Sequence, residues 1–202
     1  MNTIYAVVIG YFFGSIPWAL IIGKVFYKVD IREHGSGNLG GSNAGRVLGR
    51  HVGAIVGVLD ALKAFIAIGI TLLFADTHAA VLAGLAASIG HCYPVFAKFK
   101  GGKAVSTAFG YLFGIYLFVT NQLLWLFIIP FGFFFVMLKA TKIVSLSSMT
   151  VVTMAMIISF FIVDDRFISY AMVGITLLVI YRHRSNIKRI LDGNENKITW
   201  MK

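Results

Sequence analysis

The sequence is dominated by apolar stretches whose length is close to what a helix needs to cross a bilayer, roughly 20 residues. Seven such stretches are separated by short polar segments. They cover residues 3–23, 53–75, 79–97, 104–119, 122–138, 143–163 and 167–181, and the fourth and seventh are short. Of the 202 residues, 58% are hydrophobic and only 13% are charged, which is far from the composition of a soluble domain. We therefore expect an all-α polytopic membrane protein, with residues 1–202 forming one domain.

The cations indicate how the chain is oriented. Sixteen of the 18 Lys and Arg residues fall in the segments 24–50, 98–103, 139–142 and 182–202. Because basic loops stay on the cytoplasmic side, seven spans place the N-terminus outside and the C-terminus inside. If the tight hairpin around Asn121 did not cross the membrane, five spans would keep the same sidedness. The first stretch has no basic segment before it and no cleavage site, so we expect it to be retained as a span.

The composition also narrows the class of ligand. The single cysteine, Cys92, excludes an internal disulfide, and no paired Cys and His spacing suggests a zinc site. We expect no metal and no cofactor. The net charge of +10 is concentrated on one face. We expect that face to contact anionic lipid headgroups and not to bind nucleic acid.

The first basic segment, "HGSGNLGGSNAGRVLGR" from His34 to Arg50, holds six glycines in seventeen residues. Part of it matches the dinucleotide motif G-x-G-x-x-G, but that motif needs a preceding strand of a parallel sheet, which a chain of membrane helices does not provide. Glycine-rich turns can still direct several N–H groups at an anion. The residues expected to contact a phosphate are Ser36, Gly37, Asn38, Ser42, Asn43 and Arg46; a flexible solvated loop is the alternative.

The second basic segment, "KFKGGKAVSTAFG", places Gly101 and Gly102 before Lys103, at the start of the fourth apolar stretch. Free N–H groups at a helix start favour anions. This is not a Walker A loop, because Ala104 stands where that motif requires a hydroxyl. We expect a second phosphate-binding element here.

The third basic segment, "YRHRSNIKRILDGNENKI", follows the last apolar stretch. His183 and Asn186 are three residues apart and so share one helix face. A histidine among arginines is a candidate proton carrier or phosphate donor. Glu195 is expected to form an ion pair, not to act as a base.

Asp60 and Lys63 lie inside the second apolar stretch, three residues apart. Ionisable residues at that depth are costly and commonly functional. Because each charge has a partner in the other, we expect this pair to give structural support.

The three basic segments resemble, in order and spacing, the three motifs of the bacterial acyl-phosphate:glycerol-3-phosphate acyltransferases, the PlsY family. The resemblance extends to "VLDALK" in the second stretch and "GHCYPVF" before the second motif. Ser42, Ala104 and Ser106 depart from the residues common in that family, but they keep a hydroxyl or a small size.

The resemblance implies transfer of a fatty acyl group from acyl phosphate to the 1-hydroxyl of glycerol-3-phosphate, at a site on the cytoplasmic face of the bacterial cell membrane. It also implies seven membrane helices. The catalytic residues it implies are Ser36, Arg46, Lys103, His183 and Asn186.

Two other functions fit parts of the sequence. A small transporter of organic phosphates would use the same loops as gates, but such folds have related halves and a site at mid-membrane, and no internal repeat is evident. An acyltransferase that uses acyl-CoA or acyl carrier protein would carry H-x-x-x-x-D, and none of the five histidines is followed by aspartate at that distance.

Overall fold

The computed structural model describes residues 1–198, and over that range every regular element is a helix. The all-α expectation is therefore confirmed. The α-helices are α1 (Asn2–Ser15), α2 (Trp18–Phe26), α3 (Gly41–Leu48), α4 (Arg50–Thr71), α5 (Thr77–Cys92), α6 (Val105–Ile115), α7 (Ile129–Thr141), α8 (Val144–Ile162), α9 (Arg166–Arg182) and α10 (Arg184–Leu191). Short 3-10 turns, η1 (Ile31–Glu33) and η2 (Val95–Ala97), and π-helical turns, η3 (Tyr116–Thr120) and η4 (Leu124–Ile128), complete the chain.

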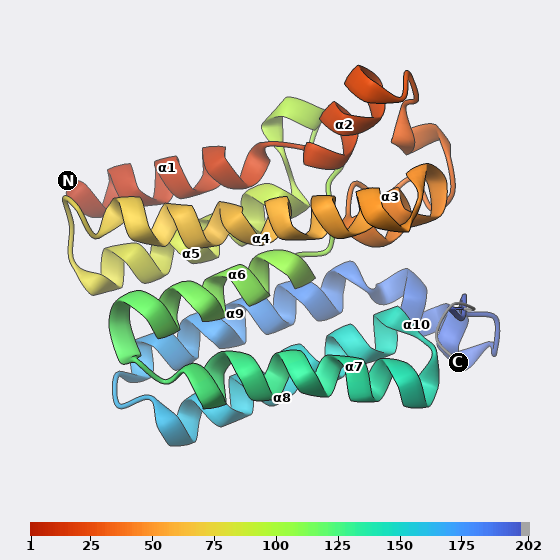
Figure 1. The fold of residues 1–202 in the computed structure, drawn as a ribbon. Helices are drawn as coiled ribbons and strands as arrows, with labels where there is room; N and C mark the ends of the chain where they lie inside the picture. The colour runs from red at the N-terminus through yellow and green to blue at the C-terminus, as the bar shows by residue number, and fades with distance from the viewer. Residues whose placement is uncertain (199–202) are drawn as a thin grey trace.

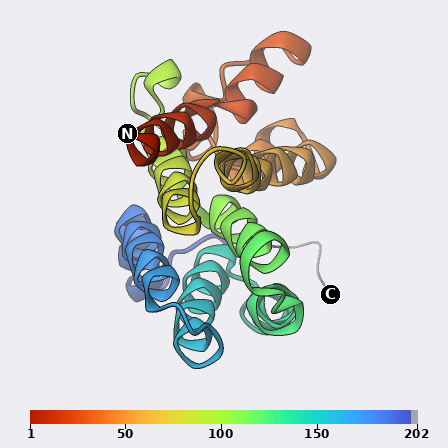
Figure 2. The ribbon, with the colours of Figure 1, turned by 90° about the vertical axis from the view of Figure 1, so that its left-hand side faces the viewer.

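The long helices lie side by side with their axes roughly parallel (Figure 1). The N-terminus lies at one end of the molecule, and α3 and α10 lie at the other. Seen along the helices, α1, α4 and α5 form one side and α7 and α8 the other, with α6 and α9 between them (Figure 2). The first motif lies between α2 and α4, the second between α5 and α6, and the third after α9. Because these helix ends all lie at the same end of the bundle, the fold brings the three motifs together there.

Within residues 1–198, five helical stretches are long and apolar enough to cross a membrane: residues 2–26, 50–71, 77–97, 124–141 and 144–162. The stretch 105–120 is shorter, and α9 has 17 residues. The predicted ends shift by a few residues. The third stretch, 77–97, agrees with the expected 79–97 but is not one helix. Helix α5 ends at Cys92, two residues before Pro94, whose missing N–H donor would break it, and Val95–Ala97 form a 3-10 turn.

The first expected span, residues 3–23, coincides with the apolar helical stretch 2–26, but that stretch is not one continuous helix. Helix α1 ends at Ser15, and α2 begins at Trp18, after Pro17. Proline removes one backbone donor and its ring clashes with the preceding turn, so the helix breaks there. In Figure 1, α2 departs from the line of α1 toward the end that carries the motifs. It packs in a small separate core with α3 and α4, which includes Ala19, Leu20, Ile31, Leu39, Ala44 and Val56.

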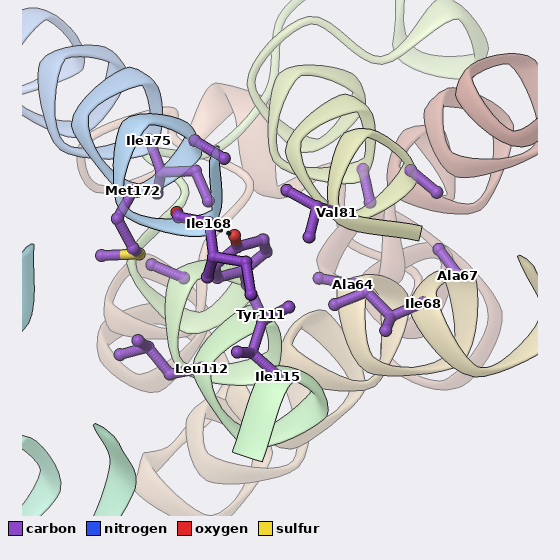
Figure 3. Close-up of a cluster of buried hydrophobic side chains, with 14 of the residues drawn as sticks. Ala64, Ala67, Ile68, Val81, Tyr111, Leu112, Ile115, Ile168, Met172 and Ile175 are labelled. Carbon is purple, nitrogen blue, oxygen red and sulfur yellow. Dashed lines mark hydrogen bonds between the residues drawn. The ribbon is translucent and has the colours of Figure 1, made fainter. Parts of the chain in front are cut away.

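The main core lies between α4, α5, α6 and α9 (Figure 3). Tyr111 is fully buried there, and its hydroxyl donates to the carbonyl of Ile168 at 3.3 Å. Small residues permit close helix approach: a Cβ at Gly110 would overlap the carbonyl of Ala61. Apolar burial gives no preference for helix contact over lipid contact in a bilayer, so close packing of this kind is what holds membrane helices together.

Candidate active site

The first motif is a loop folded around one asparagine. The Asn43 side chain accepts from the Ser36 N–H at 2.8 Å and donates to the carbonyls of His34 at 3.1 Å and Ile31 at 3.3 Å. It is 1% exposed. Its polar atoms are thus occupied by the loop, so Asn43 shapes the loop and does not face a ligand.

Gly35 and Gly37 let the same loop turn back. Their φ angles are +60° and +66°, in the left-handed region that side chains disfavour. This turn places Ser36 above α3, where its hydroxyl accepts from Arg46 Nη2 at 3.2 Å. Ser36, Ser42 and Arg46 are all exposed, so they remain available to a ligand.

The second motif is buried on one side. A Cβ at Gly101 would overlap the carbonyl of His91, and one at Gly102 would overlap the His91 imidazole. Both glycines are buried. They were expected to contact phosphate, but their visible role is close packing of the loop on the end of α5.

Two side chains from other segments hold this loop by its carbonyls. Asn38 Nδ2 donates to the Gly101 oxygen at 3.1 Å, which joins the first motif to the second. Arg182 donates to the Gly102 oxygen at 3.0 Å and to the Gly101 oxygen at 3.1 Å. Its guanidinium also lies 5.0 Å from the centre of the Tyr93 ring, within the range of a cation–π contact.

The third motif is organised by Glu195, whose side chain is 6% exposed. Its carboxylate accepts from Asn186 Nδ2 at 2.6 Å, Ser145 Oγ at 2.8 Å and Arg189 Nε at 2.7 Å. Asn186 Oδ1 in turn accepts from Lys103 Nζ. Although burial raises the pKa of Glu195, these hydrogen bonds outweigh burial and lower it below its ordinary value, so the group is an ionised ion-pair partner at neutral pH.

Cations converge on Lys103. Burial lowers the pKa of Lys103 to about 8; Glu195 opposes the shift, and the positive charges of Arg189, Arg46 and Arg182 add to it. Arg182 binds the two carbonyls that precede Lys103, and Arg189 pairs with Glu195, which Asn186 joins to Lys103. The site thus holds more positive than negative charge, as a site for phosphate dianions requires.

His183 is 3% exposed and lies between α9 and α10. Its Nδ1 lies 2.8 Å from the carbonyl of Val179. A carbonyl only accepts, so Nδ1 carries a proton, and in the neutral ring Nε2 is left as an acceptor. Burial lowers the pKa of His183 to about 4, with a further lowering from Lys103. The imidazole is therefore neutral at physiological pH and is a weak base.

Comparison with known proteins assigns the family. The family model described as glycerol-3-phosphate acyltransferase matches residues 4–193. The chain belongs to the glycerol-3-phosphate acyltransferase family. The glycerol-3-phosphate acyltransferase of Bacillus velezensis is 48% identical over 96% of this chain and 96% of its own length. That of Geobacillus kaustophilus is 44% identical over 98% and 97%.

Solved structures of this family share the fold. The crystal structure of PlsY, an integral membrane glycerol 3-phosphate acyltransferase, in its glycerol 3-phosphate form is 35% identical, with a TM-score of 0.89 over 98% of this chain and 96% of that one. The lysophosphatidic acid form gives 34% and 0.87, over the same shares of the two chains. The resemblance read from the three motifs is confirmed, and the protein is an integral membrane acyltransferase.

Within this acyltransferase the structure adds a residue that the motifs did not single out. Arg182 precedes His183 in a helix end rich in arginine and lysine, and the sequence gives no sign that its side chain turns toward the second motif. The two carbonyls it binds belong to Gly101 and Gly102.

Asp60 and Lys63 form the ion pair that their spacing predicts. Lys63 Nζ lies 2.7 Å from Asp60 Oδ1, and both side chains are almost fully buried.

Proposed function

We propose that the chain transfers a fatty acyl group from acyl phosphate to the 1-hydroxyl of glycerol-3-phosphate, forming lysophosphatidic acid and inorganic phosphate. The observation that carries this proposal is the gathering of cations in one hydrogen-bonded site: Arg182 binds the carbonyls of Gly101 and Gly102 beside Lys103, and Arg189 is joined to Lys103 through Glu195 and Asn186. Two phosphate-bearing substrates need such an excess of positive charge, whereas a thioester donor brings no phosphate to the reacting carbonyl. The PlsY crystal structures in a glycerol 3-phosphate form and in a lysophosphatidic acid form support the acceptor and the product.

The chemistry needs little beyond positioning and charge stabilisation. The acceptor hydroxyl oxygen attacks the acyl carbon, the bond from that carbon to the phosphate oxygen breaks, and the hydroxyl proton leaves with a phosphate. Acyl phosphate is a mixed anhydride with a good leaving group, so no acyl-enzyme is required. Arg46 stabilises the negative charge that grows on the leaving phosphate, and Lys103 holds the phosphate of glycerol-3-phosphate.

A substrate phosphate is the better candidate for the base. A phosphate monoester has a second pKa near 6, whereas the pKa of His183 is about 4. We infer that Nε2 of His183 accepts a hydrogen bond that orients the hydroxyl, and that Asn186 holds Lys103 beside it.

The donor is tested with purified protein in detergent, given glycerol-3-phosphate and one of three donors: palmitoyl phosphate, palmitoyl-CoA or palmitoyl acyl carrier protein. We expect phosphate release and lysophosphatidic acid with palmitoyl phosphate alone, without added metal. Turnover only with a thioester would contradict the proposed donor. Absence of turnover together with uptake of labelled glycerol-3-phosphate into proteoliposomes would favour a transporter.

Activity should also depend on the charge of Lys103. Because burial lowers its pKa to about 8, the ammonium is lost as the pH rises through that value, and kcat/KM for glycerol-3-phosphate is expected to fall above it. The substrate is already a dianion there, since its second pKa is near 6. In Lys103→Arg, which stays charged, activity is expected to be lower but without this alkaline decline. A decline identical in both proteins would assign the titration to another group.

We propose further that seven spans cross the bacterial cell membrane, with the motif end in the cytoplasm and the N-terminus outside. The concentration of basic residues at that end supports this orientation. The exposed positions Asn194 and Asp164 are suited to a test by single cysteines in a Cys92→Ala background. An impermeant thiol reagent applied to intact cells is expected to label position 164 and not 194. Labelling of 194 alone would reverse the orientation, and labelling of both or neither would change the number of spans.

A further inference from the structure

A buried polar cluster inside the helices has no part in the chemistry described above. Lys63 Nζ lies 2.7 Å from Asp60 Oδ1 and 3.3 Å from His91 Nδ1, and His91 Nδ1 lies 3.5 Å from Asp60 Oδ1. Asp60, Lys63 and His91 are 1%, 4% and 5% exposed. Three ionisable side chains at this depth are expensive to bury, so a purely packing role is a poor explanation of their presence.

The cluster fixes the orientation of the His91 ring. An ammonium group only donates hydrogen bonds, so Nδ1 accepts from Lys63, and the neutral ring carries its proton on Nε2. Asp60 holds Lys63 in place from the preceding turn of α4. The imidazole is thereby directed from α5 toward the second motif.

His91 touches the second motif at the glycine before Lys103. The Gly102 N–H donates to the His91 carbonyl at 2.9 Å, and the Gly102 Cα lies so close to the imidazole that a Cβ there would overlap Nε2. The next residue is Lys103, whose ammonium donates to Asn186. A displacement of the His91 ring must therefore be passed to Gly102 and then to Lys103.

We propose that His91, oriented by Asp60 and Lys63, is a positioning residue that sets the place of Gly102 and Lys103 and so the affinity for the glycerol-3-phosphate phosphate. The proposal rests on the function proposed above for the choice of donor in the assay and for the assignment of Lys103 to the phosphate of glycerol-3-phosphate. Its consequence is specific: loss of the His91 ring should weaken glycerol-3-phosphate binding and leave the KM for the acyl donor unchanged.

The test is a double-mutant cycle between His91 and Gly102. Gly102→Ala forces a methyl into the ring and is expected to raise the KM for glycerol-3-phosphate about tenfold or more, and His91→Ala to raise it severalfold. In the double variant the space left by the imidazole accommodates the methyl, so its KM should be lower than that of Gly102→Ala alone. Such non-additivity identifies direct contact as the cause.

Ser88→Ala is the matched control. Ser88 is buried in α5, one turn before His91, and its hydroxyl donates to the carbonyl of Gly84 in its own helix at 3.2 Å. We expect Ser88→Ala to leave both KM values unchanged. His91→Asn, which keeps a polar side chain near Lys63, should recover part of the loss seen in His91→Ala.

Binding of glycerol-3-phosphate is also measured without turnover. The melting temperature of the protein in detergent is compared with and without glycerol-3-phosphate. This readout separates failure of the positioning role from failure of the proposed donor. The proposal is overturned if the double variant is no better than Gly102→Ala, or if His91→Ala lowers the melting temperature while glycerol-3-phosphate still stabilises it as in the wild type. If Gly102→Ala yields no folded protein, the comparison of His91→Ala with Ser88→Ala tests the proposal by the same two measurements, the KM for glycerol-3-phosphate and the increase in melting temperature that it causes.

Discussion

Arg46→Ala is expected to lower kcat about 100-fold or more, because a cation aimed at growing negative charge acts mainly in the transition state. The side chain is exposed, and its hydrogen bond is to Ser36 Oγ at 3.2 Å, so its removal should leave the fold intact. Steady-state rates with palmitoyl phosphate and glycerol-3-phosphate provide the measurement.

Two further variants check the cause. Lysine at position 46 should restore only part of the rate, since a point charge lacks the planar fork that binds two phosphate oxygens. Arg50→Ala is the matched control, because Arg50 is also exposed and begins α4 just after α3. If Arg46→Ala kept near-normal kcat, or if Arg50→Ala lost as much, the assignment of Arg46 to catalysis would be wrong.

Glu195→Ala is expected to remove nearly all activity and to lower the melting temperature. The change leaves Asn186, Ser145 and Arg189 without their shared acceptor. Because Arg189 is 39% exposed, solvent screens its ion pair, and the hydrogen-bond donors left without a partner account for most of the destabilisation. Asn186 is then no longer held by Glu195, so its hydrogen bond from Lys103 is weakened. Activity and detergent melting curves measured together test this prediction.

Glu195→Gln should lie between the wild type and the alanine variant. Its amide oxygen can accept from Asn186 and Ser145, but the neutral group no longer attracts Arg189. Asp192→Ala is the control in the same segment, because Asp192 is exposed. Equal activity in Glu195→Ala and Asp192→Ala would mean that the Glu195 network is not needed to form the site.

The sequence predicted the membrane class, the helical fold and the gathering of three motifs at one end, because those features depend on long apolar runs and on the placement of cations. It did not predict the break of the first span. Pro17 sits in an unbroken apolar run, and hydropathy alone does not register its missing backbone donor.

The individual roles of site residues were harder to predict. Glycines and amides are used both to bind anions and to let loops pack closely, so Asn43, Gly101 and Gly102 fitted a phosphate cradle in sequence but occupy the loop interior in the structure. Arg182 and His91 act on a loop to which they are not adjacent in sequence. Such contacts depend on the packing of α5 and α9, which no local pattern encodes.

Direct transfer requires both substrates to be bound at the same time, with their two phosphates at the gathered cations. Initial rates measured at several concentrations of palmitoyl phosphate, each at several concentrations of glycerol-3-phosphate, test it most directly. Direct transfer predicts double-reciprocal lines that intersect, with no phosphate released in the absence of glycerol-3-phosphate. Parallel lines, with a burst of phosphate from palmitoyl phosphate alone, would show an acyl-enzyme and contradict direct transfer.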